Sequence, residues 1–231
     1  MYAARQSGVA QMAPDLLKCE ACGSVTMSHC PTDSQLEQFY KNYHATEEYL
    51  AKAHKKVSRA FKRLLIFRFR TGGRCLDVGA SIGTAARAAQ KLGFSVVAQE
   101  IDPVAVAQGR KLFKDISFVQ GFLTQVPAHP AFDLIHCAEV IEHVPDPAAF
   151  TAQLYDRLKP GGWLFLTTPD VGHSKRDEPL INWKSVKPPE HITLFTKAGL
   201  TALFTDAGFH PPRFRPHAKP GIRMTVRRPK T

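Results

Sequence analysis

The sequence has no run of apolar residues that approaches the ~20 needed for a membrane-spanning helix. It also has no charged start followed by an apolar stretch, so its beginning does not resemble a secretory signal peptide. Its five cysteines are odd in number and follow no regular framework, which favours a reducing compartment. We therefore expect a cytoplasmic protein, with Cys75 and Cys137 buried as small side chains within apolar stretches.

Acidic residues are missing from two segments, although the chain as a whole carries a formal net charge of +11. Residues 52–74 carry nine basic side chains and residues 209–231 carry seven, with no acidic residue in either segment. Residues 1–51 sum to −3 and residues 75–208 to −2. Basic segments of this kind can contact RNA or an anionic membrane surface, but they also form solvated helix faces and solubilising tails. We favour the solvated surface and keep RNA and membrane as alternative partners.

Strands and helices alternate from residue 72 onward. The pattern predicts strands over residues 74–79, 94–101, 116–121, 132–137 and 163–168, with two weaker ones over 209–215 and 222–227. It predicts helices over residues 84–92, 103–113, 147–158 and 196–207, and a turn over 159–162. This alternation implies right-handed crossovers and an α/β fold with a doubly wound, mostly parallel sheet. Ligands of such sheets bind at the carboxyl ends of the strands.

The first part of the chain gives a different pattern. Residues 1–18 have no clear periodicity, whereas residues 32–44 and 46–69 are expected to be helical. The second of these helices has its apolar side chains on one face, at Val57, Phe61, Leu64 and Leu65. Since Thr71-Gly72-Gly73 breaks the helix, we expect a cysteine-containing segment with a helical cap over residues 1–71 and a second domain over residues 72–231.

The first strand of the alternating region runs into a glycine-containing turn, Asp77-Val-Gly-Ala-Ser-Ile-Gly83. Glycines at such a strand–helix turn allow tight backbone geometry and the close approach of a ligand. Glu100 ends the next strand, 17 residues after Gly83, where a carboxylate can accept hydrogen bonds from ribose hydroxyls. By themselves these features fit a dinucleotide as well as S-adenosylmethionine (SAM).

Four segments in the same order resemble class I SAM-dependent methyltransferases. They are Asp77–Gly83, Phe132–Pro147, Leu154–Pro169, and Glu190–Leu200 followed by Ala207–Phe209. The resemblance covers about residues 74–210 and implies a Rossmann-like, seven-stranded fold that binds SAM. The cofactor-binding residues that it implies are Asp77, Gly79, Ala80, Gly83, Glu100, Ile101, Phe122, Leu123 and Ala138.

The resemblance also implies a role for each part of this set. The glycine loop approaches the methionine part of SAM and is oriented by Asp77. Glu100 holds the ribose, Ile101 packs on the adenine, and Phe122 with Leu123 flanks the adenine ring. Ala138 lies near the sulfonium. Two positions depart from the family pattern: Ser81 replaces the middle glycine, and Gln120-Gly121-Phe122 offers no carboxylate for the adenine amino group. A non-catalytic relative is therefore an alternative.

An acidic and histidine-containing cluster, Glu139-Val-Ile-Glu142-His143, follows the fourth strand. On a helical turn these three polar side chains would share one face and could bind a divalent cation. The segment resembles that of ubiquinone-type O-methyltransferases, where it is a metal site, and of small-RNA 2′-O-methyltransferases, which add a later histidine. The resemblance implies Mg²⁺ or Mn²⁺ bound by Glu139, Glu142, His143 and His191. Without a metal ion, His143 or His191 is the candidate catalytic base.

The N-terminal cysteines form part of a zinc-binding pattern. Cys19-x-x-Cys22 resembles one zinc knuckle, and His29 and Cys30 follow it closely. A closed zinc site needs four ligands with tetrahedral geometry, so we favour a vestigial ribbon over a bound zinc ion. The aromatic residues that come next, Tyr40, Tyr43 and Tyr49, fit a lid over the cofactor or the packing of N-terminal helices equally well.

Together these features predict a SAM-dependent methyltransferase that methylates an oxygen of a small-molecule, lipid-like or glycan acceptor. An RNA 2′-O-methyltransferase is the second hypothesis, and a non-catalytic protein with a SAM-binding fold is the third. The basic, amphipathic helix over residues 52–70 could hold the enzyme at a membrane surface. The loops around residues 170–195 specify neither the acceptor nor the oligomeric state.

Overall fold

The computed structural model describes residues 9–13, 16–32, 34–36, 38, 52–70, 72–216 and 218–230. The chain forms a seven-stranded sheet with the strand order β10-β11-β8-β7-β4-β5-β6. β4 pairs with β5 and β5 with β6 in parallel, whereas β10 and β11 are antiparallel. Strands that are adjacent in the sheet but distant in sequence, such as β4 and β7, require crossover connections. These features confirm the predicted Rossmann-like, mostly parallel α/β sheet.

The strands of this sheet lie close to their predicted positions. They are β4 Arg74–Val78, β5 Ser95–Glu100, β6 Ser117–Gln120, β7 Phe132–Ala138, β8 Leu158–Pro169, β10 Arg213–Phe214 and β11 Gly221–Arg227. The predicted turn over residues 159–162 was wrong, because these residues belong to β8. Gly161 has a φ of 76°, so a glycine accommodates an irregular backbone inside the strand instead of ending it.

The chain divides into two compact units. The first unit comprises Met1–Asp33, Cys137–Tyr155 and Phe165–Thr231, and the second unit comprises Ser34–His136 and Asp156–Leu164. Strands β7 and β8 each contribute residues to both units. The cofactor loop predicted from the sequence belongs to the second unit, and the acidic and histidine-containing cluster to the first.

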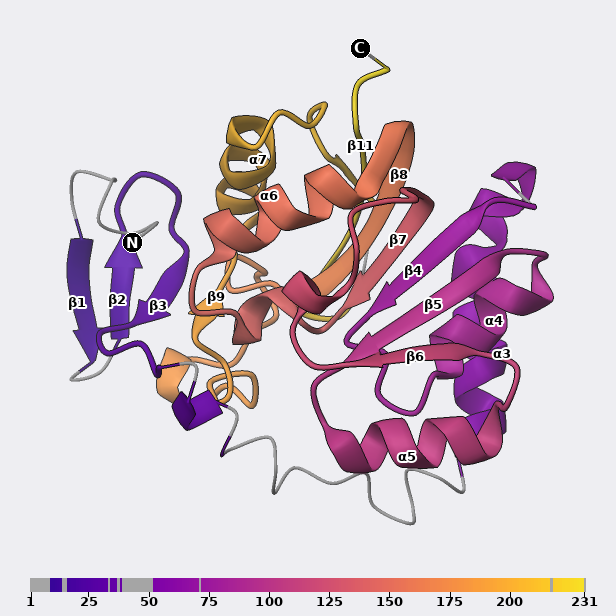
Figure 1. Cartoon of the computed structure of the whole chain (residues 1–231). Helices are drawn as coiled ribbons and strands as arrows, with labels where there is room; N and C mark the ends of the chain where they lie inside the picture. Colours follow the sequence, from indigo (N-terminus) through magenta and orange to yellow (C-terminus); the bar gives the residue numbers. More distant parts are fainter. Residues whose placement is uncertain are drawn as a thin grey trace. The chain divides into compact units, whose positions relative to one another are not determined.

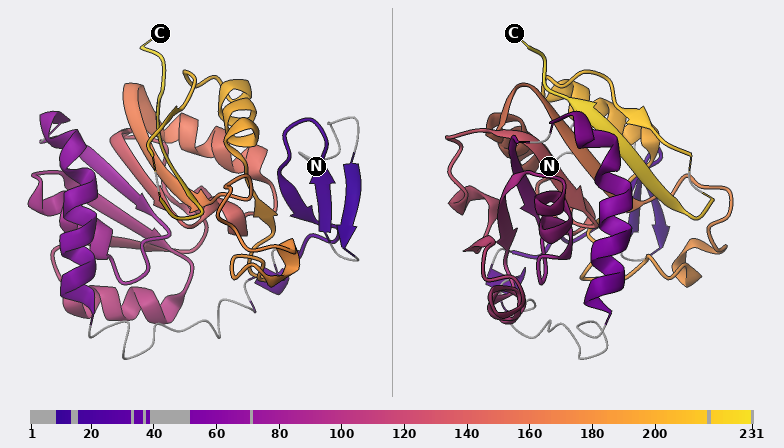
Figure 2. Two further views of the ribbon diagram at one scale, coloured as in Figure 1. Left: turned by 180° about the vertical axis from the view of Figure 1, so that it is seen from behind. Right: turned by 90° about the vertical axis from the view of Figure 1, so that its right-hand side faces the viewer.

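The second unit places helices on the strands β4, β5 and β6 (Figure 1). Its helices are α3 Ala53–Leu64, the 3-10 helix η2 Leu65–Arg70, α4 Thr84–Lys91, α5 Pro103–Leu112 and the 3-10 helix η3 Leu123–Gln125. α3 and α4 lie side by side in both Figure 1 and Figure 2. α5 begins where the Asp102 side chain accepts a hydrogen bond from the Val104 N–H at 2.8 Å, followed by proline at the first helical position.

The predicted helix over residues 46–69 is shorter than expected in the part that the structure describes. The α-helical part is α3, and the chain then tightens into η2. One face of α3 is buried through Ala53, Val57, Ala60 and Leu64, which follow the helical period. Residues 46–51 lie outside the described residues. No helix in the described ranges between residues 9 and 230 is long and apolar enough to cross a membrane.

The first unit contains the last helix and the C-terminal strands (Figure 2). α6 spans Pro147–Arg157, with its last residues in the second unit, and α7 spans Lys197–Asp206. α7 begins at Thr196, whose hydroxyl oxygen accepts a hydrogen bond from the Gly199 N–H at 3.0 Å. The 3-10 helices are η4 Ile141–His143 and η5 Leu180–Asn182.

A second, four-stranded sheet in the first unit was not predicted. Its order is β1-β2-β3-β9, and its bounds are β1 Val9–Ala13, β2 Leu16–Cys19, β3 Val25–Met27 and β9 Thr193–Leu194. All three pairings are antiparallel. No strand was predicted within the cysteine-containing segment and helical cap of residues 1–71, so β1, β2 and β3 were missed. They are only three to five residues long, and β3 finds a partner near residue 193, which local periodicity cannot reveal.

Candidate functional site

The loop after β4 has a left-handed backbone at three positions. Gly79, Ser81 and Gly83 have φ values of 64°, 49° and 82°. A Cβ at Gly83 would lie 2.6 Å from Phe118 Cζ, so only glycine fits there. Ser81 adopts this conformation despite its side chain, at a cost of roughly 1–2 kcal/mol. The expected loop therefore forms around the serine that replaces the family's glycine.

Glu100 holds this loop from the end of β5. Its Oε2 accepts a hydrogen bond from the Ser81 N–H at 2.7 Å, and its Oε1 accepts from Ile101 and Asp102 at 2.7 and 2.9 Å. Burial raises the pKa of Glu100, and the three backbone donors act against that rise. Each carboxylate oxygen has two acceptor sites, so Oε2 can still accept a hydroxyl. This is the position predicted for a ribose ligand, although ribose binding itself stays a prediction.

Asp77, at the end of β4, contacts a residue that sequence reasoning missed. Its Oδ1 lies 2.7 Å from Nδ1 of His136, on the neighbouring strand β7, and both side chains are buried. Its Oδ2 is buried without a hydrogen-bond partner among the described residues. The only sequence signal for His136 was a polar residue within an apolar strand. Whether Asp77 also orients the glycine loop stays a prediction.

Gln99 links the cofactor loop to the segment after β6. Its Oε1 accepts a hydrogen bond from the Gly79 N–H at 3.2 Å, and its Nε2 donates to the Gly121 carbonyl. The Gly121 N–H in turn donates to the Glu100 carbonyl at 2.9 Å. Phe122 is half-buried and Leu123 is buried. The residues predicted to hold the ribose and adenine thus belong to one hydrogen-bonded set of loops in the second unit, a good fit to SAM.

The acidic and histidine-containing cluster is built differently from the predicted helical turn. Glu139 directly follows Ala138, the last residue of β7, and has a left-handed φ of 55°. Only Glu142 and His143 lie on a helical turn, the three-residue 3-10 helix η4. The expectation of a shared α-helical face was therefore wrong. Instead, Thr167 holds Glu139 through two hydrogen bonds. Its backbone carbonyl accepts from the Glu139 N–H at 2.9 Å, and its hydroxyl donates to Glu139 Oε1 at 2.8 Å.

Glu142 is the buried carboxyl of the cluster, with no exposed surface. Its Oε2 accepts a hydrogen bond from the Thr168 hydroxyl at 2.8 Å, but its Oε1 has no hydrogen-bond partner among the described residues. Burial and then the neighbouring Glu139 carboxylate raise the pKa of Glu142 to about 8. A buried polar atom without a partner is costly, which points to a ligand or proton at this oxygen.

Two histidines face this carboxyl. His143 Nδ1 lies 2.8 Å from the Glu190 carbonyl oxygen, and His191 Nδ1 lies 2.7 Å from the Ser185 carbonyl oxygen. Since a carbonyl only accepts, each Nδ1 carries the proton and each Nε2 keeps its lone pair. The two imidazole rings meet edge to face with their centroids 4.7 Å apart, and His143 Nε2 lies 3.9 Å from Glu142 Oε1. Burial, with His191 next, lowers the pKa of His143 to about 4, and burial also lowers that of His191.

The donor set suits a divalent cation. The ligand atoms of Glu142, His143 and His191 all lie within 4.8 Å of one another. Adjacent ligands of an octahedral ion at about 2.1 Å are about 3 Å apart, so a modest contraction would suffice. Backbone carbonyls that fix the second nitrogen of each histidine are typical of metal sites. The structure brings three of the four predicted ligands together, while Glu139 contacts Thr167 beside them.

The N-terminal cysteines lie in a tight hairpin. Cys19 ends β2, and its carbonyl accepts from Gly23 while its N–H donates to Ser24, both at 2.8 Å. Cys30 is exposed and donates to the Pro145 carbonyl at 3.8 Å. Among the described side chains, the one group of three potential metal ligands is Glu142, His143 and His191, which includes none of these cysteines. Tyr40, Tyr43 and Tyr49 lie outside the described residues.

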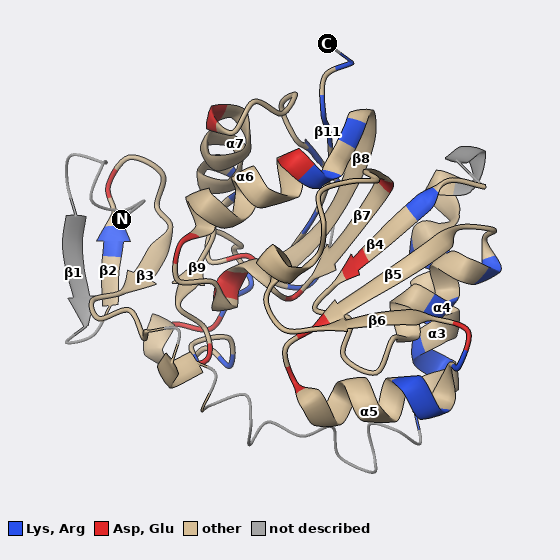
Figure 3. Ribbon diagram, viewed as in Figure 1, with Lys and Arg blue, Asp and Glu red and all other residues tan. Residues whose placement is uncertain are grey.

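The helix α3 accounts for part of the basic segment over residues 52–74. Ala53, Val57, Ala60 and Leu64 of this helix are buried, and its basic positions are the blue bands on α3 in Figure 3. The exposed cations of the helix are Lys55, Arg59, Lys62 and Arg63, and the exposed Lys52 directly precedes it. Part of the C-terminal charge has a structural role, since Arg228 donates to the Tyr155 carbonyl at 2.8 Å and lies over its ring. Because no apolar face of α3 remains exposed, insertion of this helix into a lipid surface is not supported.

Curated proteins of similar sequence include O-methyltransferases. The chain is 38% identical over 106 residues to the ubiquinone biosynthesis O-methyltransferase of Xylella fastidiosa (strain 9a5c), and this match covers 42% of each chain. The chain thus matches less than half the length of the curated relative.

Two solved structures share the fold at low sequence identity. The Burkholderia thailandensis 1,6-didemethyltoxoflavin-N1-methyltransferase, bound to S-adenosylhomocysteine (SAH), has a TM-score of 0.60 at 14% identity, covering 96% of this chain and all of that one. Magnesium protoporphyrin IX methyltransferase from Synechocystis PCC 6803, also bound to SAH, has a TM-score of 0.63 at 14% identity, covering 85% and 100%. The family model described as a methyltransferase domain matches residues 47–211, and the chain belongs to that family.

Proposed function

We propose that this protein uses SAM to methylate an oxygen of a small-molecule, lipid-like or glycan acceptor. One observation carries the proposal: two histidine Nε2 lone pairs, each fixed by a backbone carbonyl on Nδ1, accompany a buried carboxylate oxygen that has no hydrogen-bond partner among the described residues. We further propose residues 72–231 as the SAM-binding domain and residues 1–71 as its N-terminal extension.

The second unit would hold the cofactor. SAM supplies an activated methyl group on its sulfonium. The backbone of the loop from Gly79 to Gly83 would approach the methionine part, and Glu100 Oε2 would accept a hydrogen bond from the ribose. Leu123 and Phe122 would flank the adenine, where stacking takes the place of the missing carboxylate. Holding the reactants in line is the main task of such an enzyme.

The first unit would prepare the acceptor oxygen. A hydroxyl is a weak nucleophile until it loses its proton. An imidazole with a pKa of about 4, such as that of His143, is a poor base for a hydroxyl at neutral pH. A divalent cation, Mg²⁺ or Mn²⁺, would lower the pKa of the bound hydroxyl. We therefore favour Glu142, His143 and His191 as cation ligands, with Glu139 beside them, over either histidine as an unaided base.

An RNA acceptor is a second candidate, because α3 carries four exposed cations and no acidic residue. RNA binding through these charges would not depend on the RNA sequence and would weaken strongly as the salt concentration rises. A non-catalytic SAM-binding protein is the remaining alternative. SAM binding without methyl transfer to any acceptor would favour it over both enzymes.

Cofactor binding is tested by titrating SAM and SAH calorimetrically. We expect micromolar binding to the wild type, loss of binding in Glu100→Ala and weaker binding in Glu100→Gln. Asp156→Ala, which removes an exposed carboxylate of the same unit, is the control and should bind as the wild type does. Undiminished binding in Glu100→Ala would refute the ribose contact. No binding to the wild type would refute the SAM-dependent function.

Cation binding is tested by following the free Mn²⁺ signal in electron paramagnetic resonance. We expect one site in the wild type, weakened at least tenfold in Glu142→Gln and His191→Ala. Asp206→Asn, an exposed carboxylate on α7, should leave the affinity unchanged. If the cluster variants bind Mn²⁺ as the wild type does, the cation site is wrong, and the two histidines become the remaining candidates for the base.

A further inference from the structure

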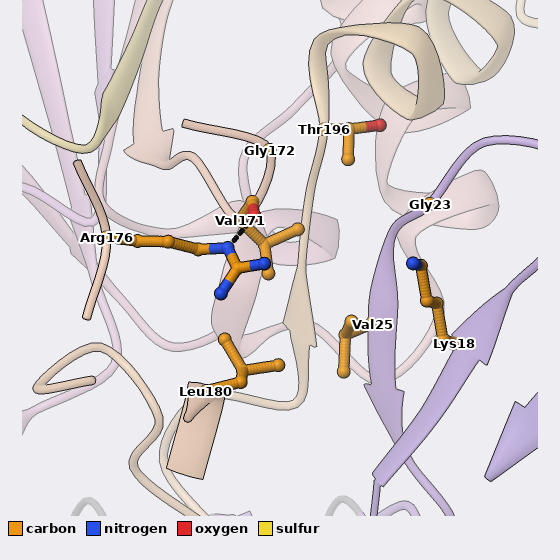
Figure 4. A pocket seen from close by; sticks show the side chains of 8 residues that line it. All are labelled: Lys18, Gly23, Val25, Val171, Gly172, Arg176, Leu180 and Thr196. Atoms are coloured by element: carbon orange, nitrogen blue, oxygen red, sulfur yellow. Dashed lines mark hydrogen bonds between the residues drawn. The ribbon is translucent and has the colours of Figure 1, made fainter. Parts of the chain in front are cut away.

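A cavity of about 180 Å³ is lined by residues of the first unit, none of which belongs to the acidic and histidine-containing cluster (Figure 4). Three segments line it: the hairpin β2–β3, the chain that follows β8, and Thr196 at the start of α7. Its wall includes two glycines, Gly23 and Gly172, where no side chain fills the space.

The floor of the cavity is apolar. Val25, Val171 and Leu180 line it and are 2%, 4% and 6% exposed. They belong to one hydrophobic cluster with Leu16, Trp183 and Leu194. A buried floor that is held by a packed core keeps its shape when a ligand enters, which lowers the entropic cost of binding.

The rim of the cavity is cationic. Lys18 of β2 and Arg176 line it, and in the view of Figure 4 they stand on opposite sides of Val25 and Val171. Arg176 Nε donates to the Val171 carbonyl at 2.6 Å, which fixes the guanidinium against the apolar wall. Its Nη1 pairs with Glu178, an exposed side chain that can swing away from it. No acidic residue is among the residues that line the cavity.

The cavity and the cluster lie near opposite ends of the same short strand. His191 comes two residues before β9, and Thr196 comes two residues after it. Five residues of extended chain span at most about 18 Å, so one elongated molecule could reach both places. Both belong to the first unit, in which Ile192 N–H donates to the Glu142 carbonyl at 2.7 Å and its own carbonyl accepts from Met27 at 2.9 Å.

We propose that this cavity binds a carboxylate or phosphate group attached to a small apolar body. Lys18 and Arg176 pair with the anion, and Val25, Val171 and Leu180 contact the apolar part. On the proposed function, this ligand is the anionic end of the methyl acceptor, whose hydroxyl lies at the cluster. The acceptor is then an elongated molecule with an anion at one end and the methylated oxygen at the other.

The test uses benzoate and phenyl phosphate, with neutral benzamide and inorganic phosphate as the comparison ligands. Calorimetric titrations are done on the full chain without SAM or metal. We expect saturable binding of benzoate or phenyl phosphate, and at least tenfold weaker binding of benzamide and of inorganic phosphate. The stronger of the two aromatic anions identifies the group as carboxylate or phosphate. Equal binding of benzoate and benzamide, or no saturable binding of either aromatic anion, would overturn the proposal.

Substitutions test whether Lys18 and Arg176 bind the anionic group. Lys18→Gln and Arg176→Gln should each weaken binding roughly tenfold or more, since charge-assisted hydrogen bonds are the strong ones. Lys184→Gln, an exposed lysine of the same unit outside the cavity, should have no effect. Lys18 is exposed, so its variant keeps the test valid if Arg176→Gln unfolds. Wild-type affinity in Lys18→Gln would refute the assignment. Glu142→Gln should bind benzoate normally, so failure of the cation site is distinguishable from failure of this cavity.

Discussion

The buried carboxyl of Glu142 should make the metal-free protein less stable as the pH rises above neutrality. Its pKa rises from 4.5 to about 8 on folding, so the folded state binds this proton more tightly than the unfolded chain does. The stabilising contribution is therefore present below the ordinary pKa and is lost as the pH rises through about 8. His143 and His191 have lowered pKa values, and their opposite contribution develops around and below the ordinary value of 6.5. Between pH 6.5 and 8 the loss from Glu142 exceeds the remaining opposite contribution of the histidines, and a Glu142→Gln variant separates the two.

The magnitude follows from the proton count. A difference of one bound proton changes the free energy of unfolding by about 1.4 kcal/mol per pH unit. In the folded protein Glu142 is almost fully protonated at pH 6.5 and about half protonated at pH 8. In the unfolded chain the same carboxyl is ionised over this whole pH interval. Integration over this interval gives a loss of about 1–2 kcal/mol. No discount for solvent screening is needed, because this side chain has no exposed surface.

Urea unfolding in the presence of a chelator measures this loss. We expect the free energy of unfolding of the wild type to fall by about 1–2 kcal/mol between pH 6.5 and 8. Glu142→Gln keeps an oxygen that accepts from Thr168 but cannot ionise, and its loss should be smaller by about the same amount. Parallel pH profiles for the two proteins would show that Glu142 is already ionised at pH 6.5, and the argument from burial would fail.

Three further perturbations test other parts of the molecule. Ser81→Gly should raise the free energy of unfolding by about 0.5–1 kcal/mol in thermal or urea unfolding, because glycine accepts a φ of 49° without a side-chain clash. Gly83→Ala should lower the free energy of unfolding by about 2 kcal/mol or more and abolish SAH binding, since the alanine Cβ would meet Phe118. Unchanged SAH affinity in this variant would contradict the argument. Any binding of the protein to anionic vesicles should disappear at about 0.5 M salt and weaken in Lys55→Gln, because only the charged face of α3 is exposed.

The sequence predicted the parts of the fold that local patterns determine. The strand β5 and the helix α5 lie within about a residue of their predicted bounds, because apolar periodicity and the Asp102-Pro103 helix start act over a few residues. The number of strands in the large sheet followed from the family resemblance. Gly161 was wrongly taken as part of a turn over residues 159–162, since a glycine also accommodates an irregular strand.

The contacts that sequence reasoning missed all depend on residues far apart in the chain. The role of His136 is recognisable only when β4 and β7 are known to be neighbours, because its partner Asp77 lies 59 residues earlier in the chain. Gln99 acquires its role from two loops that meet only in the folded sheet. The positive φ of Glu139 has no local sequence signal, because glycine and asparagine are the residues that normally indicate it.

The pairing of β3 with β9 has a consequence for how the protein folds. Thr26 contacts Ile192, 166 residues later in the chain. Synthesis at about 5–20 residues per second separates the appearance of these strands by roughly 10–30 s. During that time the hairpin of β1, β2 and β3 presents an unpaired edge on a nascent polypeptide, which is a site for wrong association. The segment before β9 also supplies His191, so strands that the family model does not cover pair beside the part of the chain that carries this histidine.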